Sequence, residues 1–271
     1  PPARSGVVFQ YYNDEQRDRM FGAETNGGGL GWIDFDCNGY PDLYVVNGCT
    51  LPHDDRDRRF GDELFRNRGD GGFFPVAALA GLDENMFGHG VAIGDADNDG
   101  WDDIYVCNFG TNSFFHNHGD GTFQETGEWA GIAPTAWNAG AAWGDVDRDG
   151  DLDLYVSVYA IGDLDNVPVC FDSATGTHRV YCGPDRYRAT NHYLFLNAGD
   201  GTFDDATLSS RCDKSNGKGM GVVVVDLDRD AWPEIFVAND MTPSFLYHNT
   251  HMIPGEPPQF EEIGTVSGVA F

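Results

Sequence analysis

Four stretches of the chain carry oxygen-bearing side chains at one repeated spacing that suits a hard cation. The stretch GDADNDGWDDIYVCN, residues 94–108, has an aspartate at every second residue from Asp95 to Asp99. Carboxylates this close repel one another unless a positive charge lies between them. Aligned on the first acid, each stretch has Asp, Asn or Glu at positions 1, 3, 5 and 9. In chain order these are Asp34, Asp36, Asn38 and Asp42; Asp95, Asp97, Asp99 and Asp103; Asp145, Asp147, Asp149 and Asp153; and Asp226, Asp228, Asp230 and Glu234.

This spacing predicts a calcium site in each stretch. Ca²⁺ takes roughly 6–8 oxygen ligands at about 2.3–2.6 Å, whereas Mg²⁺ accepts fewer protein ligands. The four side chains nearly fill that shell, and the main-chain carbonyl of position 7 would add another oxygen. The residues at position 7 are Tyr40, Trp101, Asp151 and Trp232. We therefore expect three to four Ca²⁺ ions, the alternative being acidic surface turns that bind nothing.

Position 6 distinguishes the fourth stretch from the other three. Glycine at this position, in Gly39, Gly100 and Gly150, allows the sharp turn that brings the early ligands together. The fourth stretch has Ala231 there, and its last ligand, Glu234, is one methylene longer than aspartate. The calcium prediction is therefore weakest for the fourth stretch.

The residues around each acidic stretch predict strands. An EF-hand needs Glu at position 12 and a following helix, but position 12 is valine within DLYVV, DIYVC, DLYVS and EIFVA. Segments rich in small residues (GLGWID, GVAIGD, GAAWGD and GVVVVD) precede the acids. Hairpins with an N-x-G-D-G turn follow in three copies, and the fourth copy is more divergent. Each unit is thus expected to contain four short antiparallel strands.

Repetition of this unit predicts an all-β fold made of β-propeller blades. The shortest spacing between first acids, from Asp95 to Asp145, is about 50 residues, which is typical of a four-stranded blade. We place the units at about 5–80, 81–130, 131–211 and 212–267, with the start of a fifth at 268–271. A long inserted loop, rich in Gly, Pro and Asp, occupies 159–190.

Composition excludes several classes of function. The net charge is −28, with 44 acidic and 16 basic residues, so phosphate repulsion argues against nucleic-acid binding. No apolar run approaches the 18 residues of a membrane span. Six cysteines occur without a CxxC motif, and Cys170 with Cys182 is the best candidate for a disulfide. Calcium sites and disulfides together favour a secreted, extracellular or periplasmic protein.

The repeated motif resembles the FG-GAP/VCBS repeat family, whose blades carry D-x-D-x-D-G-x-x-D loops, as in integrin α-subunit propellers. The segments GGGLGWIDFDCNGYPDLYVVNG, LFRNRGDGGF and VYCGPDRYRATNHYLFLNAGDGTF are more closely similar to the cartilage acidic protein-like group. The resemblance implies a seven-bladed propeller, of which this chain would supply about four blades. It also implies that the residues at positions 1, 3, 5 and 9 are calcium ligands, and it says little about biochemical activity.

No catalytic motif stands out, so we expect a binding or structural module and no enzyme. G-x-S-x-G, H-E-x-x-H and P-loop patterns are all missing from the sequence. A protein partner or a larger assembly is the favoured interpretation. The alternatives are a carbohydrate-binding lectin that uses exposed tryptophans and, less favoured, a polysaccharide-active enzyme.

Two further motifs have a plainer interpretation. The RGD at 68–70 aligns with other hairpin turns, so its arginine is taken as incidental. His116 and His118 could bind a transition metal, but solvated turn residues are the favoured interpretation of this pair.

Overall fold

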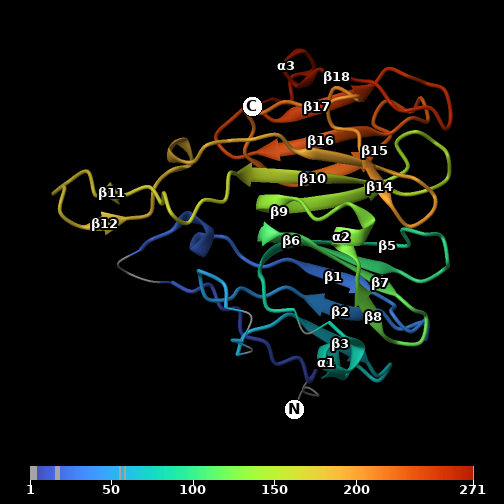
Figure 1. Cartoon of the computed structure of the whole chain (residues 1–271), viewed down its shortest axis with the longest axis horizontal. Coiled ribbons are helices and arrows are strands. Elements are labelled where there is room, and N and C mark those ends of the chain that lie inside the picture. Colours follow the sequence, from blue (N-terminus) through green and yellow to red (C-terminus); the bar gives the residue numbers. More distant parts are fainter. Residues whose placement is uncertain (1–4, 16–18, 55, 58, 83, 271) are drawn as a thin grey trace.

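The structure is a computed structural model that describes residues 5–15, 19–54, 56–57, 59–82 and 84–270. Successive four-stranded units lie side by side in chain order, from blue to red in Figure 1. Within each unit the strands are antiparallel and follow one another in sequence, apart from the insertion in the third unit. The predicted all-β fold of four-stranded propeller blades is confirmed.

The first and fourth units are separate four-stranded sheets. The first consists of β1 (Leu30–Ile33), β2 (Asp42–Val45), β3 (Glu63–Asn67) and β4 (Phe73–Pro75). The fourth consists of β15 (Gly219–Val225), β16 (Glu234–Asn239), β17 (Phe245–Asn249) and β18 (Phe260–Glu262).

The second and third units join into one eight-stranded sheet. The second unit has β5 (Phe87–Gly94), β6 (Asp103–Thr111), β7 (Ser113–Asn117) and β8 (Phe123–Glu125). The third has β9 (Thr135–Gly144), β10 (Asp153–Ala160), β13 (Tyr193–Asn197) and β14 (Phe203–Asp205). The two connect where β6 pairs with β9, from Phe109 opposite Trp137 to Thr111 opposite Thr135.

The inner strands of neighbouring units pack through glycine. A Cβ atom on Gly94 of β5 would lie only 2.9 Å from the ring of Trp143 on β9, and Gly144 faces Val224 of β15 in the same way. Glycine therefore lets the inner strands approach closely, because only a residue without a side chain leaves room for its large neighbour.

A single-turn helix follows the outer strand in three of the units. These helices are α1 (Ala77–Ala80), α2 (Gly127–Ala130) and α3 (Gly264–Ser267). Each ends at a glycine in the left-handed conformation: Gly81, Gly131 and Gly268. The predicted start of a fifth unit, 268–271, therefore begins at the residue that caps α3, and residue 271 lies outside the described residues.

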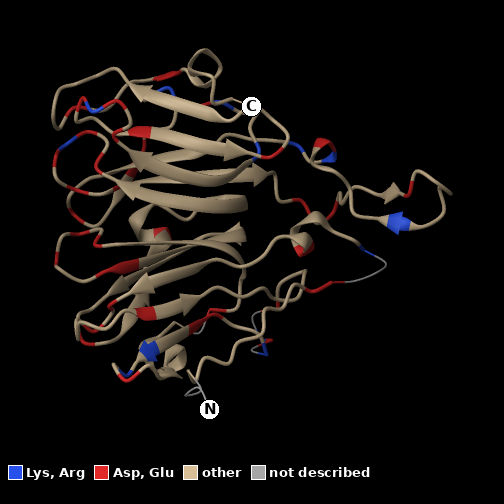
Figure 2. Ribbon diagram, turned by 180° about the vertical axis from the view of Figure 1, so that it is seen from behind, with Lys and Arg blue, Asp and Glu red and all other residues tan. Residues whose placement is uncertain are grey.

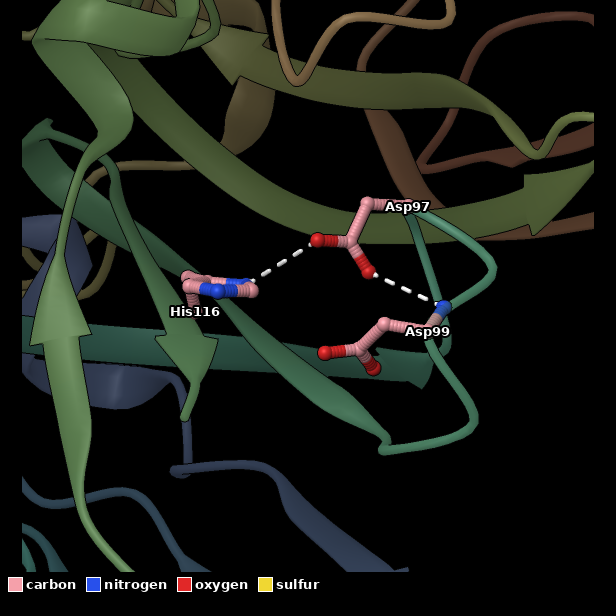
Figure 3. A group of neighbouring side chains, drawn as sticks. All are labelled: Asp97, Asp99 and His116. Atoms are coloured by element: carbon pink, nitrogen blue, oxygen red, sulfur yellow. Dashed lines mark hydrogen bonds and ion pairs between the residues drawn. The ribbon is translucent and has the colours of Figure 1, made fainter. Parts of the chain in front are cut away.

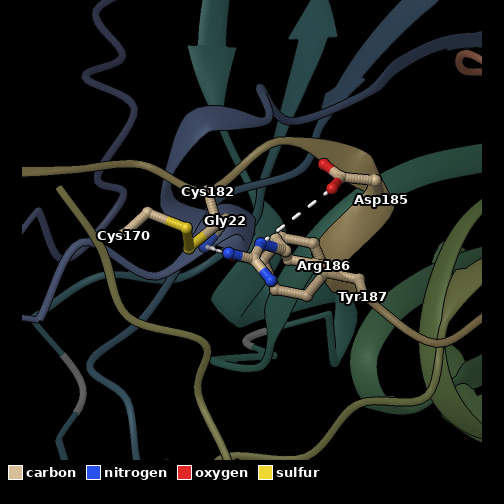
Figure 4. The surroundings of a disulfide bond; sticks show 6 residues. All are labelled: Gly22, Cys170, Cys182, Asp185, Arg186 and Tyr187. Atoms are coloured by element: carbon tan, nitrogen blue, oxygen red, sulfur yellow. Dashed lines mark hydrogen bonds and ion pairs between the residues drawn. A yellow bond between two sulfur atoms is a disulfide. The ribbon is translucent and has the colours of Figure 1, made fainter. Parts of the chain in front are cut away.

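The insertion in the third unit forms an arm between β10 and β13. It contains a two-stranded ladder, β11 (Cys170–Phe171) with β12 (Arg179–Val180), and the 3-10 helix η2 (Pro184–Arg186). The predicted disulfide between Cys170 and Cys182 is present at its base (Figure 4). The remaining four cysteines are free thiols, and only Cys37 of these is exposed.

The arm is anchored to the N-terminal part of the chain. The 3-10 helix η1 (Gly22–Thr25) lies beneath it, and the backbone N–H of Gly22 donates to the Tyr187 hydroxyl at 2.9 Å. Tyr187, Phe21 and Trp137 belong to one buried apolar cluster. Among the described residues, no helix has the length and apolar character that crossing a membrane requires.

Candidate metal centres

The four acidic stretches form the turns between the first and second strands of their units. We call these turns loops 1 to 4, comprising residues 34–42, 95–103, 145–153 and 226–234. Figure 2 shows their acidic segments along one side of the stack. The fold therefore repeats the same connection four times at one edge, with a concentration of negative charge.

Each loop is shaped by hydrogen bonds from its own backbone to its acids. In loop 1, Asp34 accepts from the amides of Asn38 and Gly39 at 3.0 and 2.8 Å. In loop 2, Asp95 accepts from Asp99 and Gly100 at 3.0 and 2.9 Å. The position 5 side chain then accepts from the position 7 amide, so the residues Tyr40, Trp101, Asp151 and Trp232 are held at the turn by their N–H groups.

Position 6 has a positive φ in all four loops. The angles are 83° at Gly39, 93° at Gly100, 102° at Gly150 and 75° at Ala231. Glycine adopts this region freely, whereas alanine meets a steric penalty of about 1 kcal/mol or more. Loop 4 thus keeps the same turn despite the strained alanine, and the role predicted for glycine agrees with the backbone.

The position 9 carboxylates are buried at the base of each loop. Asp42, Asp103, Asp153 and Glu234 are at most 2% exposed. Asp103 accepts from the backbone amides of Asn117 and Ala96 at 2.8 and 3.1 Å. Glu234 accepts from the backbone amide of Leu227, the position 2 residue of loop 4, at 2.8 Å. The position 2 amides of loops 2 and 3 donate to Asp103 and Asp153 in the same way.

Several of the predicted ligands lie close enough together to share one cation. Potential ligand atoms lie within 4.8 Å of one another in five sets: Asp34, Asp36 and Asp42; Asp145, Asp147 and Asp153; Asp226, Asp228 and Asp230; Asp97 and Asp99 with His116; and Asp228 and Glu234 with His248. The other predicted side-chain ligands, Asn38, Asp95, Asp103 and Asp149, lie in the same loops outside these sets. Position 7 carbonyls stay a prediction.

Three buried carboxylate oxygens in loops 1 and 3 are left unpaired within the described part of the chain, although the other oxygen of Asp36 is bonded to Arg66. Asp36 Oδ1, Asp42 Oδ2 and Asp145 Oδ1 have no hydrogen-bond partner among the described residues. An unpaired buried carboxylate oxygen is costly, on the order of 1–3 kcal/mol or more. A hard cation would satisfy these oxygens, so the donor set fits calcium.

Burial and repulsion between neighbouring carboxylates raise the pKa of several loop acids, so the ionised form is disfavoured when no cation is bound. Burial, with the nearby charges of Asp147 and Asp149, raises the pKa of Asp153 to about 8. Burial likewise raises the pKa of Asp103 to about 7 and that of Asp42 to about 6. A bound divalent ion would reverse this effect because it favours the ionised carboxylates.

Third-strand residues reach into the loops, and sequence reasoning largely missed them. The Arg66 Nε donates to Asp36 Oδ2 at 2.6 Å. His116 Nδ1 lies 3.5 Å from Asp97 Oδ2 (Figure 3) and 3.3 Å from Asp103 Oδ1. His248 Nδ1 lies 3.1 Å from Glu234 Oε1. The sequence pairs His116 with His118, whereas in the structure the oxygen neighbours of His116 come from loop 2. An alignment of the third strands, ELFRN, SFFHN, YLFLN and FLYHN, would have revealed the basic or imidazole side chain that precedes the final asparagine in three of them.

A cavity of about 270 Å³ opens beside loop 2, between the second and third units. Asp97, His116, Trp129, Asp200 and Phe203 contribute to its lining. Trp129 is 65% exposed. The RGD segment forms the turn between β3 and β4, with φ of 73° at Gly69, and it lies against loop 1, where the ring of Tyr40 packs on Gly69.

Comparison with known proteins identifies the repeat. A model described as an FG-GAP-like repeat matches residues 50–106, 96–156 and 180–237, more than half of the chain. No curated protein gives a significant match. A solved structure concerning recognition of non-reducing terminal N-acetylglucosamine by an Agrocybe aegerita lectin is 18% identical, with a TM-score of 0.41, covering 84% of this chain and 50% of that chain. The chain thus spans about half the length of that lectin.

Proposed function

Because the chain belongs to the FG-GAP-like repeat family, we propose that it is a calcium-binding β-propeller module that binds a protein partner outside the cytoplasm. The observation that carries the calcium proposal is the set of buried, unpaired carboxylate oxygens in loops 1 and 3. The likeness to the cartilage acidic protein-like group and the seven-bladed ring remain predictions.

Calcium would act as a structural ion in this proposal. Positions 1, 3, 5 and 9 would hold it, with the position 7 carbonyl as a further ligand. Loop 3 is the best candidate, because Asp145, Asp147 and Asp153 converge there without a competing basic side chain on the adjacent third strand. A bound ion would fix each turn and so the angle at which the two inner strands of a unit meet.

Two apolar end faces support a protein partner. On β15, Val223 and Val225 are 44% and 39% exposed, although the corresponding face of β9 is covered by the next unit. On β1, Leu30 and Trp32 are 62% and 57% exposed. Exposed apolar patches of this kind mark interaction surfaces, so we assign the partner to these two faces.

The Cys170–Cys182 disulfide supports an extracytoplasmic compartment. Disulfides persist in oxidising environments and are rare in the cytosol. Free calcium is also available there at concentrations that suit weak oxygen sites.

The proposal is tested by thermal unfolding of chelator-treated protein at increasing calcium. A ligand that binds only the folded state stabilises it by about 2.7 kcal/mol per site at 100 times its Kd. We expect the Tm to rise with calcium and to fall when EDTA is added. A Tm that does not respond to calcium would remove the structural role of the ion.

A second candidate function, glycan binding, is supported by Trp129. Its exposed indole lines the cavity beside loop 2 together with Asp200, and such an aromatic face can stack on a sugar ring while carboxylates accept from hydroxyls. Binding on a glycan array that is lost in Trp129→Ala and kept in Trp32→Ala would favour it.

A further inference from the structure

The third strands of the four units differ at one position that borders the metal loops. The residue just before the final asparagine of β3, β7, β13 and β17 is Arg66, His116, Leu196 and His248, respectively. Cross-strand pairing with the outer strand places all four in the same register. We call this residue the selector position.

In the second unit the selector position contributes a nitrogen to the acid cluster. His116 Nδ1 lies 3.5 Å from Asp97 Oδ2 and 3.3 Å from Asp103 Oδ1, longer than the common N–H···O hydrogen bond of about 2.9–3.0 Å. Two ligands of a tetrahedral zinc ion, each about 2.0–2.1 Å from the metal, lie about 3.3–3.4 Å apart. The imidazole nitrogen therefore lies at ligand-like separations from both carboxylate oxygens, and potential ligand atoms of Asp97, Asp99 and His116 lie within 4.8 Å of one another. Figure 3 shows the imidazole directed at the Asp97 carboxylate.

The fourth unit also brings a histidine to its loop carboxylates, here with one contact at hydrogen-bond distance. His248 Nδ1 lies 3.1 Å from Glu234 Oε1 and 3.7 Å from Asp228 Oδ2. These three residues form one of the sets whose ligand atoms lie within 4.8 Å of one another. Ala231 and Glu234, two of the three departures from the calcium pattern, occur in this loop, and the third, Asn38, is in loop 1. The approach of histidine to carboxylate is nevertheless kept in loop 4.

The other two units place a different chemistry at the selector position. Leu196 offers no ligand, so loop 3 is left with oxygens alone. Arg66 brings a permanent positive charge to loop 1, and its guanidinium is bonded to Asp36 at 2.6 Å. This arginine would both occupy a ligand oxygen and repel an incoming cation.

We propose that the selector position sets the ion class of each loop. His116 and His248 make loops 2 and 4 mixed nitrogen and oxygen sites for a zinc-like divalent ion. Leu196 leaves loop 3 to calcium, and Arg66 weakens loop 1. Imidazole is a good ligand for zinc and its neighbours in the first transition row, whereas carboxylate and carbonyl oxygens suit calcium. The calcium assignments of loops 1 and 3 rest on the proposed function, whereas the zinc assignment of loops 2 and 4 requires only that these loops bind a cation.

The experiment counts ions on the full chain. Chelator-treated protein is exchanged into excess Ca²⁺ and titrated with Zn²⁺, and bound ions are counted by native mass spectrometry, with affinities from calorimetry. Wild type should take two zinc ions. His116→Leu and His248→Leu, which copy the residue of the third unit, should each lose one, with affinity falling at least about tenfold. His118→Leu is the matched control and should keep both.

Variants that are expected to gain ion binding complete the test, because misfolding can remove a binding site but cannot create one. Leu196→His should add a third zinc ion, and Arg66→Leu should tighten calcium at loop 1 by about tenfold. The inference is overturned if the His116→Leu/His248→Leu double variant folds and retains wild-type zinc affinity, or if Leu196→His gains nothing. Absence of calcium binding in wild type and in every variant, with histidine-dependent zinc binding intact, would refute the proposed function and the calcium assignments of loops 1 and 3, and would leave the zinc assignment of loops 2 and 4 standing.

Discussion

The Asn197 side chain of the third unit donates from Nδ2 to the carbonyl oxygen of Ala96 in the second unit, at 2.7 Å. The backbone N–H of the same asparagine donates to Asp153 Oδ1 at 3.0 Å, at the base of loop 3. One residue thus bonds to the loop of its own unit and to the loop of the preceding unit. Asn117 and Asn249 repeat the contact with Phe35 and Val146.

This relationship makes Asn197→Ala a test of how the units are held together. The substitution removes the bond and leaves the carbonyl of Ala96 without this partner, so unfolding free energy should fall by about 1–3 kcal/mol. Chemical denaturation measures it. Asn67→Ala is the matched control, because Asn67 Nδ2 donates to Pro41 within its own unit. A larger loss in the control than in Asn197→Ala would contradict the inter-unit role.

Loop 3 gives the sharpest calcium prediction. Asp147→Asn removes a carboxylate that is 6% exposed and belongs to the all-oxygen set, so calcium affinity at that loop should fall at least about tenfold. Calorimetry with Ca²⁺ checks the affinity, and the gain in Tm on adding calcium should shrink. Asp204→Asn on the exposed outer strand should leave both unchanged. Equal responses of the two variants would argue against loop 3 as a site.

Glu84 gives a pH prediction outside the metal loops. Burial raises its pKa to about 7, and Glu125 adds to the shift, while its carboxylate accepts from Asn108 at 2.9 Å. The folded protein then holds a proton that the unfolded chain releases near pH 4.5. This contribution to stability is complete below about pH 4.5 and is lost as the pH rises through about 7.

Glu84→Gln should therefore flatten the pH dependence of stability. Glutamine keeps the accepting oxygen without the charge, so the variant should lose less Tm than wild type between pH 5 and pH 8 at saturating calcium. The expected difference is about 2–4 °C for each kcal/mol. Glu128→Gln on exposed α2 is the control and should follow wild type. A wild-type slope in Glu84→Gln would show that another group carries the dependence.

The arm in the third unit is tested through Tyr187. Tyr187→Phe removes the hydroxyl that accepts from Gly22 and leaves that N–H without this partner, so stability should fall by about 1 kcal/mol. Thermal unfolding measures the change, and Tyr40→Phe at an exposed loop position should cost nothing. An unchanged Tm in Tyr187→Phe would mean that packing alone holds the arm.

Much of the fold was predictable because the repeat supplies its own internal alignment. Acids at fixed spacing, small residues before them and N-x-G-D-G after them recur, so strand order and loop position follow from local rules. The Cys170–Cys182 disulfide was also anticipated, and it is confirmed. The pairing of β6 with β9 was not anticipated, since it depends on how two units meet and leaves no local pattern.

The sequence predicted the site residues that are close together along the chain, but it did not predict those that a neighbouring strand contributes. Spacing placed the loop acids, but Arg66 and His248 lie on another strand of their sheets, where sequence distance hides the contact. The raised pKa of Asp153 likewise depends on burial, which no motif encodes.

The bond between Gly22 and Tyr187 joins residues that are 165 positions apart and so spans the first three units. A repeat array assembled only from neighbour contacts can gain or lose a unit and still propagate. Here a duplication or deletion of one unit within that span would carry the arm away from its partner. The Gly22–Tyr187 bond therefore depends on how many units lie between these two residues, unlike the contacts between adjacent units.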